Sequence, residues 1–433
     1  MTRNMQVSVR AAFTVVTAAA LAATVSCSSG PPAPPTSSST ASSTESAASS
    51  PAATTSSLSS PTSAMLQPFD AATLRAEFER TAKELLVPGA MVLLQTPGGS
   101  LTASYGTGTR GADRAVSAED HIRVGSVTKT WTTTVVLQLV QEGKLALEDP
   151  VSKYRPDVPN GDAITVEQML TMRSGLFNYT ETLELNTAMD QDPQKVWQPE
   201  ELLALAFAHP PYFAPGQGFH YSNTNTVLLG LICEKVEGKT LPTLFKERIF
   251  EPLGLKGTVF PELSSSAIPE PHPHGYFYGD NVLTMTNPAL PDQMQKEAMA
   301  GDLAPNDVTD GNPSWAWAAG SGISTAADLK ILGEALVNGK LLKLELQQKR
   351  LDSVTPTNPD NPGGASYGLG IAKFGNLYGH TGELPGFNTF MGNDPVNSVT
   401  LVVWTNLAPA ADGRDPATTI ARTLIGKVYR PVP

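Results

Sequence analysis

The chain has 433 residues, 40% of them hydrophobic, so it is long enough to bury a large core in one big domain or two. Its formal net charge is -11 and it has no basic cluster, which argues against nucleic acid or an anionic lipid surface as its partner. The two cysteines, Cys27 and Cys233, do not form the framework of a disulfide-rich protein.

The chain begins with a stretch typical of an export signal. Arg3 and Arg10 precede an apolar run over residues 11–25 that is too short to span a membrane. Small residues before Cys27 suit a lipoprotein signal, so we expect residues 1–27 to be a signal and Cys27 to carry a lipid. This places the protein on the outer face of the cytoplasmic membrane or in the cell envelope.

Residues 28–64 consist almost entirely of Ser, Thr, Ala and Pro, which predicts a disordered tether with nothing to bury. The folded domain should therefore cover residues 65–433, and it carries a net charge of -12 once Arg3, Arg10 and Glu45 are removed. Cys233 lies in an apolar run and reads as a core residue, and we expect no disulfide.

The domain opens with an amphipathic helix over residues 69–86, capped by Asp70. Two short apolar runs at 90–95 and 101–105, separated by a turn rich in Gly and Pro, predict a β-hairpin.

The stretch from Ser126 to Glu142 contains no Gly or Pro and has apolar residues at helical spacing. Its β-branched residues resemble a strand, but its length favours a buried helix that ends at Gly143. Ser126 and Lys129 would then share a face on the first turn. A serine at a helix start beside a lysine suits nucleophilic catalysis, since the amine can accept the hydroxyl proton.

The middle of the domain reads as helical and its end as strands. Helices are expected after the capping box at 165–168 and over 199–208, 227–236, 241–250, 325–337 and 416–428; strands are expected over 367–374, 386–391 and 399–405; residues 261–310 look like loop. The fold class is therefore α+β, with one antiparallel sheet built from both termini, flanked by helices, and an inserted all-helical region.

Two further motifs follow Ser126-Val127-Thr128-Lys129: Tyr221-Ser222-Asn223 and His380-Thr381-Gly382. In this order, the three motifs resemble those of the penicillin-recognising serine hydrolases, which include class C β-lactamases, D-alanyl-D-alanine carboxypeptidases and related esterases. Two short stretches, residues 173–176 (Arg-Ser-Gly-Leu) and 221–225 (Tyr-Ser-Asn-Thr-Asn), are similar in sequence to the corresponding stretches of the carboxypeptidases. The resemblance covers residues 69–428 and implies a β-lactamase/transpeptidase-like fold.

The resemblance implies that Ser126 forms an acyl-enzyme, with Lys129 and Tyr221 sharing the proton transfers. Either Lys129 or Tyr221 could be the base, and the sequence does not choose between them. The resemblance also implies roles for the substrate-binding residues. The N–H groups of Ser126 and Glu383 would form the oxyanion hole, and Asn223 would hydrogen-bond either the substrate amide or Lys129. The His380-Thr381-Gly382 segment would hold the acyl chain, and Trp315 would form a wall of the cleft.

Two positions depart from the carboxypeptidase pattern. Relatives commonly carry an arginine after Tyr-Gly-Leu-Gly to grip the substrate carboxylate, whereas this chain has Lys373 on that strand. Glu383 follows the His-Thr-Gly motif and would repel a carboxylate. Peptide and neutral ester or amide substrates therefore remain almost equally favoured.

Other patterns give weaker hypotheses. Residues 364–368 match the Gly-x-Ser-x-Gly elbow of α/β-hydrolases, but a loop precedes them and a strand follows. His272 and His274 beside Glu270 have no third ligand at suitable spacing, so we expect no metal and no cofactor. A penicillin-binding sensor without turnover is the alternative from another functional class. We expect a monomer that acts on a small molecule or a peptidoglycan fragment.

Overall fold

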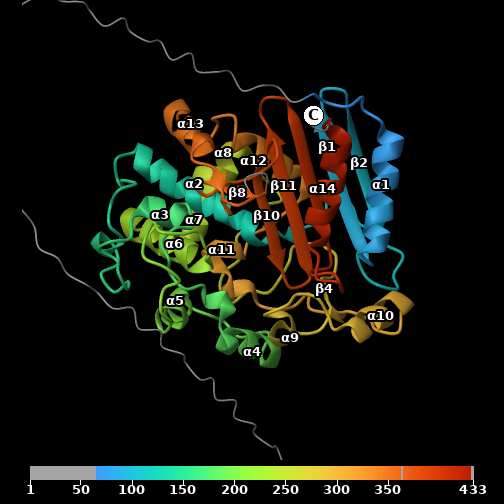
Figure 1. Ribbon diagram of the computed structural model, residues 1–433, viewed down its shortest axis with the longest axis horizontal. Helices are drawn as coiled ribbons and strands as arrows, with labels where there is room; N and C mark the ends of the chain where they lie inside the picture. Colours follow the sequence, from blue (N-terminus) through green and yellow to red (C-terminus); the bar gives the residue numbers. More distant parts are fainter. Residues whose placement is uncertain (1–64, 362–363, 431–433) are drawn as a thin grey trace, which may run out of the picture. The chain divides into compact units, whose positions relative to one another are not determined.

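The computed structural model describes residues 65–361 and 364–430 (Figure 1). The predicted export signal and tether, residues 1–27 and 28–64, lie outside the described residues. No helix in the described part of the chain combines the length and apolar character that a membrane span requires.

Eight strands within the described residues form one antiparallel sheet in the order β2-β1-β12-β11-β10-β9-β8-β7. Their bounds are β1 (Gly89–Thr96), β2 (Gly99–Gly106), β7 (Thr355–Pro356), β8 (Ser366–Tyr367), β9 (Ala372–Phe374), β10 (Leu377–Leu384), β11 (Phe387–Asp394) and β12 (Val399–Thr405). The first hairpin pairs with the last strand, with Ala90 opposite Thr405. This arrangement confirms the α+β prediction of a sheet built from both termini.

Both faces of the central strand β12 are covered, which explains its unbroken apolar sequence. Leu401 and Val403 enter the core beneath α1 (Ala71–Glu84) and α14 (Pro416–Val428), which lie side by side over one face (Figure 1). Val402 and Trp404 enter the core on the other face, where α12 (Ala326–Ala335) packs. Alternate residues of one strand thus join the two cores.

The predicted cap of the first helix is confirmed, because the Asp70 carboxylate accepts hydrogen bonds from the backbone N–H groups of Ala72 and Thr73. The inserted helical region lies on the β10 side of the sheet (Figure 1). Its helices are α2 (Thr128–Gln141), α3 (Val166–Leu170), α4 (Leu183–Gln191), α5 (Pro199–Phe207), α6 (Asn223–Glu237), α7 (Leu241–Phe245) and α8 (Glu251–Leu253). The helix predicted at 241–250 is confirmed, and its second half, Lys246–Phe250, is a π-helix that joins α7 to α8.

The remaining described elements connect this region to the sheet. They are β3 (Ile122–Arg123) paired with β6 (Ile323–Ser324), β4 (Tyr276–Phe277) paired with β5 (Asn306–Asp307), and the helices α9 (Asn281–Thr284), α10 (Asp292–Ala300), α11 (Trp317–Gly320) and α13 (Leu344–Asp352).

Two predictions were wrong in detail. The single strand expected over 367–374 is split into β8 and β9, because Gly370 adopts a left-handed φ of 64°. The N–H of Gly370 donates to the carbonyl oxygens of Leu170 and Gly368 and not to a neighbouring strand. Residues 261–310, expected to be loop, contain α9, α10 and two short strands.

Candidate active site

Helix α2 is buried along almost its whole length, from Thr128 to Leu139. Its threonine hydroxyls are satisfied by backbone carbonyls: Thr130 Oγ1 donates to Val127, Thr134 Oγ1 to Thr130, and Thr132 Oγ1 to Ala318 of α11. These bonds let a β-branched, hydroxyl-rich sequence form a core helix. The result is a rigid support for the turn that carries Ser126.

Ser126 lies in a 3-10 turn, Gly125–Val127, that leads directly into α2. Gly125 has a φ of 52°, and a Cβ placed on it would lie 2.4 Å from the backbone nitrogen of Glu383 on β10. A Cβ on Gly382 would lie 1.9 Å from the carbonyl oxygen of Val124. Two glycines therefore allow the serine turn and the strand to meet backbone to backbone.

The side-chain amine of Lys129 lies against the serine. Lys129 Nζ is 2.9 Å from Ser126 Oγ and 2.7 Å from the carbonyl oxygen of Ala319. The side chain is fully buried, and burial lowers the pKa of Lys129 well below its ordinary value. This is the contact expected from the spacing of Ser126 and Lys129, and it places a weakly basic amine on the hydroxyl proton.

Tyr221 approaches the same pair from the loop before α6. Lys129 Nζ lies 4.9 Å from the centre of the Tyr221 ring. The Tyr221 hydroxyl is buried and has no well-formed hydrogen bond to any described residue. Burial raises the pKa of Tyr221 well above its ordinary value, and the nearby Ser126 hydroxyl opposes this shift only weakly. The structure thus brings together the hydroxyl, the amine and the phenol of the three predicted catalytic residues.

Ser126 opens onto a cavity of about 250 Å³. Asn223, Trp315 and Glu383 line this cavity, as their predicted substrate-binding roles require. Asn223 makes no hydrogen bond to Lys129; its side-chain amide donates to Thr180 Oγ1 at 3.0 Å, which corrects one of its two predicted partners. This bond holds the amide at the cavity wall.

His380 does not line the cavity; it is 3% exposed, and its ring packs against those of Tyr221 and Tyr367. Its Nδ1 lies 2.5 Å from the carbonyl oxygen of Thr381, which can only accept, so Nδ1 carries the proton and Nε2 faces the Tyr367 hydroxyl at 3.2 Å. Burial lowers the pKa of His380 to about 3. His380 is therefore neutral at physiological pH and adds no positive charge to the site. Thr381 and Gly382 are likewise absent from the cavity lining among the described residues.

Glu383 follows them at the cavity edge, and Asn388 Nδ2 donates to its carboxylate at 3.3 Å. Part of the Glu383 surface faces the cavity, yet the surrounding protein removes enough water to raise its pKa well above the ordinary value, and nearby Asp415 raises it further.

The sequence interpretation missed several residues of the site. The carbonyl of Ala319 holds Lys129, and no side-chain pattern signals such a role. Phe277, Met285 and Asn281 line the cavity from the segment interpreted as loop. The apolar residues within that Pro-rich segment could have indicated that it forms part of a cavity wall.

The rival motif and the histidine pair lie elsewhere. Ser366 of the Gly-x-Ser-x-Gly match belongs to the short strand β8 and is followed by a turn and β9, so the helix that an elbow needs is missing there. His274 Nδ1 lies 2.6 Å from Asp307 and His272 Nε2 3.4 Å from Glu270. No group of three metal-ligating side chains occurs in residues 65–361 and 364–430.

Comparisons with known proteins agree with this geometry. The Beta-lactamase family model matches residues 74–425. The crystal structure of a D-stereospecific amidohydrolase from Streptomyces sp. is 31% identical with a TM-score of 0.69, covering 82% of this chain and 98% of that one. PbpX of Bacillus subtilis (strain 168), named as a penicillin-binding protein, is 27% identical over 285 residues, 66% of this chain and 61% of its own length. Esterase EstB of Burkholderia gladioli is 31% identical over 233 residues, 48% of this chain and 58% of its own.

The chain therefore spans about three fifths of the length of these curated relatives. The family match, the order of the three motifs and the Ser126–Lys129 contact all indicate one kind of protein. The chain therefore belongs to the Beta-lactamase family.

Proposed function

We propose that the protein hydrolyses amides or esters whose acyl group carries no carboxylate, through an acyl-enzyme on Ser126. The Ser126 Oγ attacks the carbonyl carbon, its proton passes to Lys129, and the bond to the leaving amine or alcohol breaks as that group takes the proton. Water then releases the acyl group by the reverse proton path. The N–H groups of Ser126 and Glu383 are the proposed oxyanion donors.

Lys129 is the proposed base of the free enzyme. The lowered pKa of Lys129 favours the neutral amine, and the raised pKa of Tyr221 favours the neutral phenol. A neutral amine accepts a proton, whereas a neutral phenol donates one, so we assign Tyr221 to protonation of the leaving group; the proton that Lys129 took from Ser126 then passes to the Tyr221 phenolate and restores both neutral groups.

The charge of the cavity supports the restriction on substrates. No Lys, Arg or His of the described residues lines the Ser126 cavity, and Glu383 is its one ionisable carboxyl group there. Lys373, the sequence candidate for a carboxylate grip, lies over the Tyr378 ring at 4.7 Å and does not line the cavity. A carboxylate-terminated substrate would lose its hydration without gaining a cation, so strict D-Ala-D-Ala carboxypeptidase activity is disfavoured.

The test uses soluble residues 65–433. A fluorophosphonate should label Ser126, and mass spectrometry should locate the adduct; Ser126→Ala should lose all labelling. A neutral ester, an amino-acid amide, a D-Ala-D-Ala peptide and a fluorescent penicillin are then compared on one preparation. Peptide hydrolysis far above that of the neutral substrates would contradict the proposal. Stable penicillin capture without turnover would support the sensor alternative.

We also propose that the protein is exported as a monomer and anchored by a lipid on Cys27, with residues 28–64 as its tether. The basic and apolar pattern of residues 3–25 supports this placement. Metabolic labelling with a fatty acid should mark the full chain, and Cys27→Ser should lose the label and release the protein from the membrane fraction.

A further inference from the structure

One short segment of the chain, residues 177–181, holds the loop that carries Tyr221. The Tyr221 hydroxyl itself makes no well-formed hydrogen bond to any described residue, and its ring packs against the rings of Tyr367 and His380. The position of the hydroxyl therefore depends on how the backbone of the loop at 220–223 is anchored. An error of about 1 Å in such a position can cost an enzyme about a hundredfold in rate.

The anchor before Tyr221 is Glu181. One carboxylate oxygen of Glu181 lies 3.0 Å from His220 Nε2, and since a carboxylate can only accept, Nε2 carries the proton. The other carboxylate oxygen accepts a hydrogen bond of 2.7 Å from the Tyr212 hydroxyl. The His220 ring stacks on the Tyr212 ring, with 3.6 Å between the ring centres. Glu181 thus holds His220 directly at its edge and, through Tyr212, at its face.

The anchor after Tyr221 is Asn178, which is buried. Its side-chain oxygen accepts a hydrogen bond of 3.0 Å from the backbone N–H of Asn223, the first residue of α6, and the Asn223 amide donates to Thr180 Oγ1. The side-chain nitrogen of Asn178 donates to Glu181 at 3.1 Å, so the two anchors are connected. Tyr221 therefore lies between two residues that the same segment holds.

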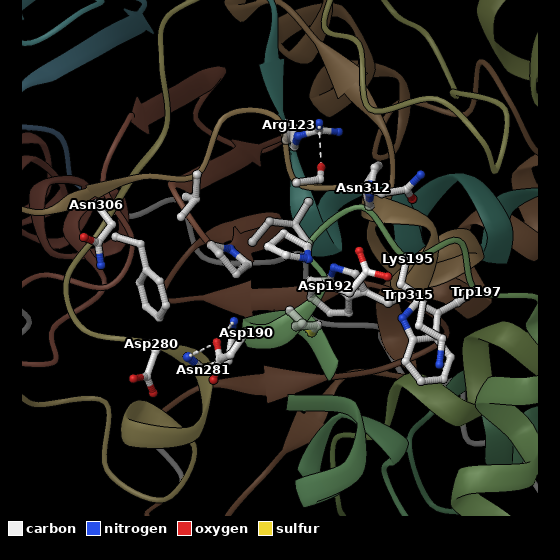
Figure 2. A pocket seen from close by; sticks show the side chains of 18 of the residues that line it. Arg123, Asp190, Asp192, Lys195, Trp197, Asp280, Asn281, Asn306, Asn312 and Trp315 are labelled. Carbon is white, nitrogen blue, oxygen red and sulfur yellow. Dashed lines mark hydrogen bonds between the residues drawn. The ribbon is translucent and has the colours of Figure 1, made fainter. Parts of the chain in front are cut away.

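The segment is also attached to the wall of the Ser126 cavity. Tyr179 is fully buried, and its hydroxyl donates to the backbone carbonyl of Trp315 at 2.8 Å. Trp315 lines both the Ser126 cavity and a neighbouring cavity of about 220 Å³, which is the one that Figure 2 shows. Residues 177–181 thus connect the Tyr221 loop to a wall of the Ser126 cavity.

We propose that Glu181 is a positioning residue for Tyr221: it holds His220 and, through the loop backbone, keeps the Tyr221 hydroxyl directed at the leaving group. Glu181 lines neither cavity, so it acts through Tyr221 and not by touching the substrate. This inference rests on the proposed hydrolysis at Ser126 and on the assignment of Tyr221 as the donor of the leaving-group proton.

The experiment compares two esters that have the same acyl group and different leaving groups. A nitrophenolate leaves without a proton, whereas the alkoxide of an ethyl ester needs one as the bond breaks. A misplaced Tyr221 should therefore slow the ethyl ester selectively. For Glu181→Ala we expect kcat/KM to fall about tenfold for the ethyl ester and by less than about twofold for the nitrophenyl ester. Because the acyl group is the same, a change in acyl binding cancels in the ratio of the two values.

Three further variants sharpen the comparison. Tyr221→Phe removes the proton donor and should lower the ratio of ethyl to nitrophenyl ester further than Glu181→Ala. In the Tyr221→Phe background, Glu181→Ala should change the ratio no more, because its effect passes through the missing hydroxyl. Glu181→Gln keeps an acceptor for His220 and should restore part of the ratio.

Glu184→Ala is the matched control. Glu184 is an exposed glutamate on α4 that lines neither cavity, and its removal should keep the wild-type ratio. The Glu181 side chain is itself 44% exposed, so its removal leaves the core intact. Each ratio is measured within one variant, so a partial loss of folding does not imitate the result.

The outcomes separate the two proposals. If the wild type hydrolyses neither ester through Ser126, the proposed function fails. If it hydrolyses both but Glu181→Ala leaves their ratio unchanged, or lowers it equally when Tyr221 is already Phe, then Glu181 does not position Tyr221. An unchanged ratio in Tyr221→Phe itself would overturn the inference together with the assignment of Tyr221 as the proton donor.

Discussion

Arg123 and Lys129 are buried basic side chains, three residues before and three residues after Ser126 in the sequence, and burial lowers the pKa of both with different consequences. Arg123 ends β3, is 3% exposed, and is held by three backbone carbonyls; burial lowers its pKa to about 10, so it stays charged. Lys129 has only one hydroxyl and one carbonyl as partners, and burial lowers its pKa well below the ordinary value. The charged Arg123 guanidinium therefore has a structural role, here called the clamp, because it holds three backbone carbonyls together. The Lys129 amine, in contrast, can act as a base.

The largest effect should come from Lys129→Arg, which gives this position the chemistry of Arg123. An arginine cannot accept the Ser126 proton at neutral pH, so we expect kcat/KM for a neutral ester to fall about 10³-fold. Stopped-flow acylation measures the loss, and thermal unfolding checks the fold. Lys296→Arg, an exposed change on α10 outside both cavities, is the control. Near wild-type acylation by Lys129→Arg would mean that Lys129 is not the base.

Removal of the clamp tests the other half of the comparison. Arg123→Met leaves the carbonyls of Ser266, Thr309 and Gly311 without their donor, and we expect a loss of about 3 kcal/mol in the free energy of unfolding. Urea denaturation measures it. Arg422→Met, an exposed arginine on α14, should change stability little. Unchanged stability of Arg123→Met would show that the clamp contributes nothing.

The pH profile distinguishes the amine from a permanently charged group. Catalysis needs neutral Lys129, so kcat/KM should rise about tenfold per pH unit in acid and level off well below the ordinary lysine pKa. Because the pKa of His380 is about 3 and that of Tyr221 is raised, neither group should add a step between pH values of about 5 and 9. A plateau reached only near the ordinary lysine pKa would contradict the burial argument.

The smallest effect should come from Glu383→Gln. The raised pKa of Glu383 reduces the charge that it carries, so its removal should improve kcat/KM for a carboxylate-bearing ester relative to its neutral isostere by only about threefold. The gain should grow at higher pH, where Glu383 ionises fully. Glu345→Gln, an exposed change on α13, should leave this ratio unaltered.

Local spacing and composition were sufficient for much of the fold. The absence of Gly and Pro after Ser126 predicted the helix, and a helix places residues three apart on one face, so the Ser126–Lys129 contact followed. The apolar runs at both ends predicted the sheet that joins β1 to β12. These features depend on residues close together in the sequence, and the periodicity of apolar residues indicates such local structure directly.

The pKa values of the site residues and the shape of the cavities depend on long-range packing, so only the tertiary structure determined them. The pKa shifts of Lys129, Tyr221 and Glu383 depend on how much water the assembled domain excludes, and the carbonyl partners of Arg123 come from segments more than a hundred residues away. The cavity that Arg123 and Trp315 line joins parts of α4, α9 and the loop after β10, and the meeting of these segments leaves no periodic signal in the sequence. Burial and the pairing of distant segments are properties of the folded chain, so the motifs identified the reacting groups and the packing determined their protonation and the substrate they face.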